Sequence, residues 1–305
     1  MPIEKSEYIW FNGTFVPWDE AKTHVLDHGL HYGSGVFEGI RAYETKDGNS
    51  AIFRLKEHVE RMFRSARVLG MMIPYSKEKV REAIVETIRK NGLKDSYIRP
   101  LAWYGYGELG VHARGLNANV VVAAWRWGRY LGKEGVRTKI STWIRNNPNS
   151  LPNEAKITGS YVNATLATNE ARISGYDEAI MLDYRGFISE GPGENLFIVE
   201  NGRLLTPPTS ASILPGITRD TVMVLARDLG YEIKEIDINR SKLYNADEAF
   251  FTGTAAEVVP IYEVDDRKIG NGKTGPVTKR IQDEFFAVVR GGRQQYNHWL
   301  TYVYE

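Results

Sequence analysis

The stretch LPNEAKITGSYVNATLATNEAR, residues 151–172, lies near the start of the second half of the chain. It follows a strand-like run, TKISTWIR (138–145), and a turn rich in Asn and Pro, NNPNS (146–150), and it leads into a helical pattern. Lys156 lies between the turn and the helix, with Ser160 and Tyr161 close by. It is either a solvated surface lysine or the amine on which the chemistry of the protein depends.

The second half continues with strand and helix patterns that alternate irregularly. Turn signals at Arg185-Gly186 and Asn201-Gly202 divide a meander, a helix is expected from Thr218 to Leu229, and strands are expected in YEIKEIDI (231–238) and EAFFTGT (248–254).

The first half predicts a hairpin turn, two helices and a buried strand. The turn is at Asn12-Gly13, the helices cover 56–69 and 76–91, and the strand covers 117–127. The glycine-rich segment after Trp127 is a linker or, nearly as well, a long hairpin loop. Because no steady βαβ alternation is present, the sequence favours a mixed α/β or α+β enzyme of two domains. We expect domains at 1–127 and 139–305, with an interdomain loop at 128–138.

The composition favours work on small molecules. The chain has 305 residues, a formal net charge of +1 and no cysteine. Nearly balanced charge gives no reason to expect a nucleic-acid or membrane partner, and the lack of cysteine excludes disulfides, thiolate nucleophiles and Cys-based metal sites. We expect no metal site. The amino terminus has no signal-peptide pattern and no apolar run is long enough to span a membrane, so a soluble, cytoplasmic protein is expected.

Two segments are typical of anion sites at helix N-termini. LPGITRD (214–220) places Pro215 and Gly216 before a helix that starts at Ile217 and Thr218. FFTGTAAEV (250–258) ends a strand at Thr254, and Ala255 and Ala256 are expected to open a short helix. Each alone is more typical of ordinary helix capping without a ligand, but two in one half of the chain are more suggestive of phosphate.

Other segments supply a cation, a fixed carboxylate and a pocket wall. Arg61 lies beside the apolar stripe of its helix and could reach inward to a phosphate or stay solvated. Glu190 lies in the constrained turn FISEGPGENLF (187–197) with Glu194, which suits a carboxylate paired with a ring nitrogen or an arginine, and equally a salt-bridged turn. HYGSGVFEGIRAY (31–43) is more typical of a pocket wall or packed loop than of a regular element.

Together these residues match the needs of pyridoxal phosphate. A catalytic lysine needs a carbonyl partner, which the cofactor aldehyde supplies, and the cofactor also needs a phosphate clamp and an acid beside its pyridine nitrogen. Spacing alone leaves the surface-lysine alternative open.

The sequence resembles the branched-chain amino acid aminotransferases, the class IV, fold type IV enzymes that use pyridoxal 5'-phosphate. The resemblance runs almost from end to end through seven segments: residues 8–43, SYIRPL (96–101), EAKITGSYVNATLA (154–167), GFISEGPGENLF (186–197), PPTSASILPGITRD (207–220), TGTAAEV (252–258) and GPVTKRIQDEFF (275–286). It implies a small N-terminal α/β domain and a larger, β-barrel-like C-terminal domain.

The resemblance also assigns cofactor contacts. Lys156 corresponds to the catalytic lysine, which bonds to the cofactor and then carries a proton between substrate Cα and cofactor C4′. Tyr161 corresponds to the residue that binds the ring hydroxyl, and Glu190 to the carboxylate on the pyridine nitrogen. The phosphate contacts correspond to Arg61, Ile217, Thr218 and Thr254.

Substrate contacts follow in the same way. The apolar lining corresponds to Phe37, Val111 and Trp127, with Val111 expected from a partner subunit. The groups around the α-carboxylate correspond to Tyr97, Thr254 and Ala255. Those that receive the side-chain carboxylate of glutamate correspond to Tyr32, Arg99 and Tyr130.

The expected activity is transfer of the amino group between L-leucine, L-isoleucine or L-valine and 2-oxoglutarate, which places the protein in branched-chain amino-acid biosynthesis. The alternatives are a D-amino acid aminotransferase, an R-amine aminotransferase or an aminodeoxychorismate lyase of the same fold, or a non-catalytic metabolite-binding protein. A homodimer is the smallest expected assembly, with a hexamer as the larger option.

Overall fold

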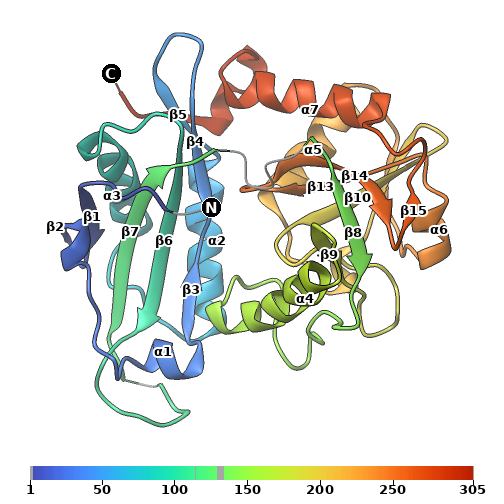
Figure 1. Cartoon of the computed structure of the whole chain (residues 1–305). Helices are drawn as coiled ribbons and strands as arrows, with labels where there is room; N and C mark the ends of the chain where they lie inside the picture. The colour runs from blue at the N-terminus through green and yellow to red at the C-terminus, as the bar shows by residue number, and fades with distance from the viewer. Residues whose placement is uncertain (1–2, 114, 129–133, 305) are drawn as a thin grey trace. The chain divides into compact units, whose positions relative to one another are not determined.

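The chain divides by its contacts into two compact units. The computed structural model describes residues 3–113, 115–128 and 134–304 (Figure 1). One unit comprises Met1–Gly128, Ala155–Gly159 and Ala287–Glu305, and the other comprises Arg129–Glu154 and Ser160–Phe286. The domain boundaries expected from the sequence stay a prediction, and much of the expected interdomain loop falls outside the described residues.

The first unit is built on an antiparallel sheet with the order β16-β5-β4-β6-β7-β1-β2, and β3 pairs with β6. Its described strands are β1 Tyr8–Phe11, β2 Thr14–Pro17, β3 Gly35–Phe37, β4 Ile40–Glu44, β5 Ser50–Phe53, β6 Ser96–Tyr104, β7 Ala118–Arg126 and β16 Leu300–Tyr302. Its α-helices are α1 His28–Tyr32, α2 Leu55–Val68 and α3 Lys77–Lys90, with short 3₁₀ helices at Trp18–Glu20 and Gln294–Trp299.

Helices α2 and α3 pack on one face of this sheet (Figure 1). Val120, Val122 and Ala124 alternate along β7 and are fully buried, and they join a core that includes Met62 of α2 and Ile84 of α3. The alternate residues of β7 and the apolar residues at helical spacing in α2 and α3 therefore pack together in one apolar layer.

The hairpin turn and the start of the second helix expected in this half are confirmed. Asn12 and Gly13 both have positive φ, 46° and 96°, and join β1 to β2 in a two-residue turn. The Ser76 hydroxyl caps α3 by accepting a hydrogen bond from the Lys79 amide at 3.1 Å.

The segment 31–43, expected to be a pocket wall without regular structure, instead contains the end of α1 and the strands β3 and β4. Pairing of Val36 with Ala102 and of Ile40 with Ile98 explains this, because both bury branched residues against β6.

The second unit is built on a mixed sheet with the order β12-β11-β10-β13-β14-β8-β9, and β15 pairs with β14. Its described strands are β8 Val136–Ile140, β9 Glu178–Ile180, β10 Asn195–Glu200, β11 Arg203–Thr206, β12 Ile233–Glu235, β13 Glu248–Gly253, β14 Glu257–Val264 and β15 Arg267–Lys268. Its helices are α4 Tyr161–Ile173, α5 Ile217–Asp228, α6 Arg240–Tyr244 and α7 Pro276–Val289, whose last residues belong to the first unit, with a 3₁₀ helix at Thr209–Ala211. A further 3₁₀ helix, Thr158–Ser160, begins in the first unit and ends at the first residue of the second.

Two strands are shorter than the sequence predicts. TKISTWIR leaves the ladder after Ile140, because the Glu170 carboxylate accepts hydrogen bonds from the Ser141 hydroxyl and the Thr142 amide. YEIKEIDI keeps only β12, Ile233–Glu235, beside β11. The mixed α/β class expected from the sequence is confirmed, and among the described residues no helix is both long and apolar enough to cross a membrane.

The segment that carries Lys156 is fixed to the first unit by a close backbone approach. Gly33 ends α1 with φ +61°, and its carbonyl accepts hydrogen bonds from the Gly159 amide (3.0 Å) and the Thr158 hydroxyl (2.7 Å). A Cβ on Gly33 would lie 2.6 Å from the Gly159 Cα. No side chain fits at Gly33 unless the lysine segment moves.

We expect Gly33→Ala to destabilise the protein by roughly 2–4 kcal/mol, because it combines a strained left-handed backbone with a backbone clash. Gly70→Ala is the matched control. Its φ is +66° and a Cβ there would meet nothing within 4 Å, so backbone strain alone should cost about 1–2 kcal/mol. Denaturant unfolding of both variants measures the difference, and equal losses would contradict the proposed clash.

Candidate functional site

Lys156 is held between β3 and α2 by its backbone. Its carbonyl accepts a hydrogen bond from the Phe37 amide at 3.1 Å, and its amide donates to the Ser65 hydroxyl of α2 at 2.9 Å. Ala155 and Ile157 on either side are both 4% exposed and join the core of the first unit. The Lys156 ammonium lies 4.8 Å from the centroid of the Phe37 ring. The lysine therefore has a fixed backbone and an aromatic neighbour, unlike a solvated surface lysine.

Arg61 of α2 is buried and held in a two-pronged contact by Glu38. The Arg61 Nε donates to Glu38 Oε1 at 2.7 Å and Nη2 donates to Oε2 at 2.9 Å. Arg61 is 5% exposed and Glu38 is fully buried. Of the two directions expected for Arg61, the structure shows the inward one. Its partner Glu38 was not predicted from the sequence.

His58 completes a buried cluster with these two residues. Its Nδ1 lies 2.8 Å from Glu38 Oε2, and the ring is 1% exposed. Burial lowers the pKa of His58 below its ordinary value of 6.5, and the charges of Arg61 and Lys156 lower it further against the opposing effect of Glu38.

Glu38 has the opposite balance of effects. Burial alone would raise the pKa of Glu38, but the charge and hydrogen bonds of Arg61, with those of His58, hold it well below its ordinary value of 4.5. Glu38 is therefore the ionised centre of the cluster at neutral pH.

Four of the predicted substrate residues gather on the same unit. The Arg99 guanidinium lies 4.8 Å from the Phe37 ring centroid, and its Nη2 donates to the Tyr97 hydroxyl at 3.1 Å. The rings of Tyr97 and Trp127 are 4.7 Å apart. The Arg99 Nε is buried and has no hydrogen-bond partner within the described ranges. An aromatic setting in which a buried guanidinium keeps one N–H without a partner among the described residues suits a ligand with an apolar part and an anionic part.

The remaining substrate candidates of this half are more exposed or outside the described residues. Tyr32, in α1, is 44% exposed and its ring lies 4.5 Å from that of His28. Val111 is 86% exposed in the loop between β6 and β7, near Gly110, whose carbonyl accepts a hydrogen bond from His28 Nε2 at 2.7 Å. Tyr130 lies outside the described residues.

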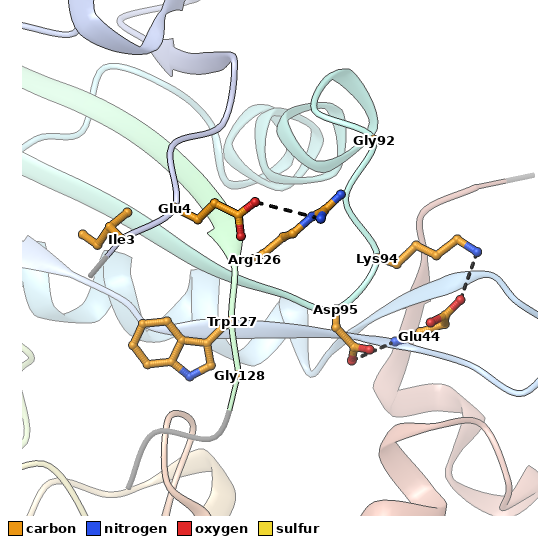
Figure 2. A pocket seen from close by; sticks show the side chains of 9 residues that line it. All are labelled: Ile3, Glu4, Glu44, Gly92, Lys94, Asp95, Arg126, Trp127 and Gly128. Carbon is orange, nitrogen blue, oxygen red and sulfur yellow. Dashed lines mark hydrogen bonds and ion pairs between the residues drawn. The ribbon is translucent and has the colours of Figure 1, made fainter. Parts of the chain in front are cut away.

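The cavity beside Trp127 has a polar edge (Figure 2). It measures about 850 Å³ and is lined by Ile3, Glu4, Glu44, Gly92, Lys94, Asp95, Arg126, Trp127 and Gly128. Lys94 pairs with Glu44 at 3.0 Å, and Arg126 lies 3.9 Å from Glu4. The charges of its wall are largely paired with one another, so the cavity by itself indicates no ligand.

In the second unit, Glu190 is buried in a network of hydrogen bonds. Its Oε1 lies 2.8 Å from Arg145 Nη2, and its Oε2 accepts from Asn195 Nδ2 at 2.9 Å and from the Leu214 amide at 3.1 Å. Both carboxylates of the turn, Glu190 and Glu194, are 4% exposed. The structure thus has the pairing with arginine that the sequence left open, but Arg145 itself was missed because only its position at the end of a strand-like run marked it.

The first turn of α5 is the helix terminus predicted from LPGITRD. Gly216 is the N-cap and has no side chain with which to cap the helix, and Ile217 and Thr218 are 8% and 4% exposed. A Cβ on Gly216 would lie 1.9 Å from Asn195 Oδ1, so this position requires glycine. Amide groups at a twelve-residue helix N-terminus suit an anion.

The second predicted helix terminus is wrong. Thr254, Ala255 and Ala256 form the turn of the hairpin between β13 and β14, where Gly253 pairs with Glu257. Glu257 has φ +63°, which closes the loop, and the following apolar run continues as β14 rather than as a helix. Thr254 can still offer its hydroxyl and its backbone amide, but without a helix dipole.

Tyr161 is the first residue of α4 and lines a cavity of about 280 Å³ together with Gly193 and Glu194. The first unit offers an amine and an arginine, and the second unit offers helix amides, hydroxyls and a buried carboxylate with a countercharge. This donor set fits the aldehyde, phosphate, ring hydroxyl and pyridine nitrogen of pyridoxal phosphate. Among the described residues no cluster of three or more His, Asp or Glu could hold a metal ion.

We expect the free energy of unfolding to fall as the pH drops from about 6.5 towards 5, because the unfolded chain binds a proton at His58 that the folded chain resists. Glu38 adds little in this range, since the stability from its lowered pKa is lost only below about 4.5. His58→Asn should flatten this loss in denaturant unfolding measured at both ends of the range. His298→Asn, at an exposed histidine, should keep the wild-type slope, and an unchanged slope in His58→Asn would contradict the assignment.

Comparison with known proteins gives the family. The model of the family described as amino-transferase class IV matches residues 35–264. Branched-chain-amino-acid aminotransferases from Pseudomonas aeruginosa and Escherichia coli K12 are 47% and 46% identical to the chain. The first match covers 98% of both chains and the second 99% of both.

Solved structures give the same result. A T.th. branched-chain amino acid aminotransferase, complexed with N-(5'-phosphopyridoxyl)-L-glutamate, has a TM-score of 0.94 and 50% identity, covering 98% of this chain and 99% of that one. The enzyme of Thermoproteus uzoniensis with norvaline has a TM-score of 0.95 and 47% identity, covering 98% of this chain and 100% of that one. The fold type IV architecture expected from the sequence is confirmed. The chain belongs to the class IV aminotransferases, within the group of branched-chain-amino-acid aminotransferases.

Proposed function

We propose that the protein transfers the amino group between L-leucine, L-isoleucine or L-valine and 2-oxoglutarate, giving branched-chain 2-oxo acids and L-glutamate with pyridoxal 5'-phosphate as cofactor. The observation that carries this proposal is the match, over 98–99% of the chain, to proteins named branched-chain-amino-acid aminotransferase, at 46–47% identity. The fixed backbone of Lys156 and the aromatic setting of Arg99 support it from the site itself.

Each cofactor group has a residue suited to it. Arg61, Ile217, Thr218 and Thr254 would hold the phosphate, and Tyr161 would bind the ring hydroxyl. When bound, the cofactor supplies an aldehyde and a protonated ring that accepts electron density from the substrate Cα. Lys156 would bond to the aldehyde carbon and, once the substrate displaces it, move the proton between substrate Cα and cofactor C4′.

Glu190 would accept a hydrogen bond from the protonated pyridine nitrogen. A buried carboxylate with this task must stay ionised, and the Arg145 guanidinium at 2.8 Å supplies the countercharge that burial otherwise makes costly. The hydrogen bonds from Asn195 and Leu214 fix its direction. Arg145 is therefore a positioning residue for Glu190 in this proposal.

The substrate side chain is either aliphatic or a carboxylate, and one pocket must accept both. Phe37 and Trp127 would line it with Val111, and Arg99 would receive the carboxylate of glutamate with Tyr32 and Tyr130. Contact of Arg99 with the Phe37 ring and the Tyr97 hydroxyl shields its charge when the aliphatic substrate is bound. The substrate α-carboxylate would contact Tyr97, Thr254 and Ala255.

The assembly and cellular location belong to the same proposal. Val111 is 86% exposed in this chain, as expected of a residue donated to the pocket of a partner subunit. We therefore propose a homodimer at least, with a hexamer as the larger option. A cytoplasmic location is proposed on separate grounds, from the sequence.

The purified protein should absorb near-visible light through its bound cofactor, and Lys156→Ala should lose both this band and turnover, because no other group would bond to the aldehyde. Lys94→Ala, at a partly exposed lysine paired with Glu44, is the control and should keep both. Absorption spectra and a leucine/2-oxoglutarate assay measure the outcome. A colourless wild-type protein would refute the cofactor assignment.

Arg99→Ala should lower kcat/KM for glutamate and 2-oxoglutarate at least tenfold more than for leucine, because a charge-assisted contact worth about 1.5–3 kcal/mol is lost only with the dicarboxylic substrates. Arg126→Ala, on the neighbouring strand β7, should change neither. Half-reactions with each substrate separate the two effects, and equal losses would refute the role of Arg99.

A substrate panel with 2-oxoglutarate as acceptor tests the choice among enzymes of this fold. Turnover with L-leucine, L-isoleucine and L-valine is expected. Activity with D-alanine or an R-amine and none with L-leucine would instead indicate a D-amino acid or R-amine aminotransferase.

A further inference from the structure

The carboxylate of Glu38 occupies a fixed place at the junction of β3 and β4. Its backbone amide donates to the Pro100 carbonyl of β6 at 2.9 Å, and its side chain is 0% exposed. Three donors meet its two oxygens: Arg61 Nε on Oε1, and Arg61 Nη2 and His58 Nδ1 on Oε2. A carboxylate with these contacts cannot turn without breaking at least one of them.

The contacts also fix the plane of the Arg61 guanidinium. Glu38 binds the edge formed by Nε and Nη2, at 2.7 and 2.9 Å, and this two-pronged pairing defines both the position and the orientation of the group. The Nη1 end can then point in one direction only. Glu38, held by the sheet, thereby sets the direction of those N–H groups of Arg61 that do not donate to Glu38.

His58 holds the other side of the same carboxylate. Glu38 Oε2 can only accept, so His58 Nδ1 carries the proton and donates. Its lowered pKa keeps the ring neutral at physiological pH, so His58 adds a hydrogen bond to Glu38 without adding a second cation beside Arg61. The cluster therefore has one fixed anion, one fixed cation and one neutral donor.

We propose that Glu38 and His58 are positioning residues that orient Arg61 to grip the phosphate group of the cofactor. This inference rests on the proposed function, since it assigns a task to Arg61 in cofactor binding. Neither residue touches the phosphate; both act through the direction of the guanidinium.

The negative charge of Glu38 determines which variant can test its positioning role. A negative Glu38 also repels a phosphate dianion, so a variant that removes the charge would mix lost orientation with lost repulsion. Glu38→Asp keeps the charge and shortens the side chain by one methylene, so it can no longer hold both Arg61 nitrogens from the same backbone position. It changes orientation alone.

The experiment compares pyridoxal 5'-phosphate with pyridoxal, which lacks the phosphate, by titrating the near-visible band of the full-length protein after removal of its cofactor. Glu38→Asp should bind pyridoxal 5'-phosphate at least tenfold more weakly than the wild type and bind pyridoxal within twofold of the wild type. Glu57→Asp is the matched control, because Glu57 pairs with Arg54 Nε at 2.9 Å at the start of the same helix. It should leave both affinities unchanged.

His58 supplies an independent variant should Glu38→Asp not fold. His58→Leu removes the third donor and should also weaken pyridoxal 5'-phosphate selectively, by about threefold to tenfold. His58→Asn places an amide donor near the position of Nδ1 and should restore the affinity to within twofold.

The outcomes separate this inference from the proposed function. A wild-type protein that binds neither compound refutes the proposed function and this inference with it. A wild type that binds pyridoxal 5'-phosphate, with a folded Glu38→Asp or His58→Leu variant of equal affinity, refutes only the positioning role. An equal loss for both compounds also refutes it, because general damage to the site, rather than phosphate orientation, would then be the cause.

Discussion

The site depends on the backbone pairing of residues 155–159 with residues 33–37. These segments are far apart in the sequence, yet hydrogen bonds from Gly159, Thr158 and Phe37 join their backbones. The segment's two apolar residues, Ala155 and Ile157, are inserted into the core of the first unit, which anchors the backbone on both sides of Lys156. Core packing thus fixes the backbone from which the amine projects.

One buried ion pair in each unit follows the same pattern. Arg61 is paired with Glu38, and Arg145 with Glu190, in each case at less than 3 Å and with both partners nearly inaccessible to water. Such pairs contribute little to net stability, because desolvation offsets most of the attraction, but removing one partner is costly. We interpret both pairs as contacts that fix the direction of a side chain. Arg61 and Glu190 would face the cofactor, and each is held in place by a partner, Glu38 or Arg145, that would not touch it.

The sequence predicts what short-range physics controls. The Asn12-Gly13 turn, the capped start of α3 and the glycine before α5 all depend on residues within a few positions, and all three are confirmed. It fails where distant residues compete. Glu170 takes the Thr142 amide and ends a strand early, and strand pairing with β13 converts the run after Thr254 from an expected helix into a hairpin. Glu38, His58 and Arg145 carry no local signal, because their importance arises from partners about 20 or more positions away. The resemblance to a family located the residues expected at the cofactor, while their supporting partners emerged only from the three-dimensional contacts.

The contact between Gly33 and Gly159 also has an evolutionary consequence. Neither residue bears a functional group, and neither would be identified by a search for chemistry. Yet a Cβ on either one meets the backbone of the other. The two positions therefore form a single unit of selection, in which a side chain at one cannot be compensated by shrinking the other, since both are already glycine. We expect lineages of this fold that retain the lysine to retain both glycines or to have rebuilt the α1–β3 connection as a whole.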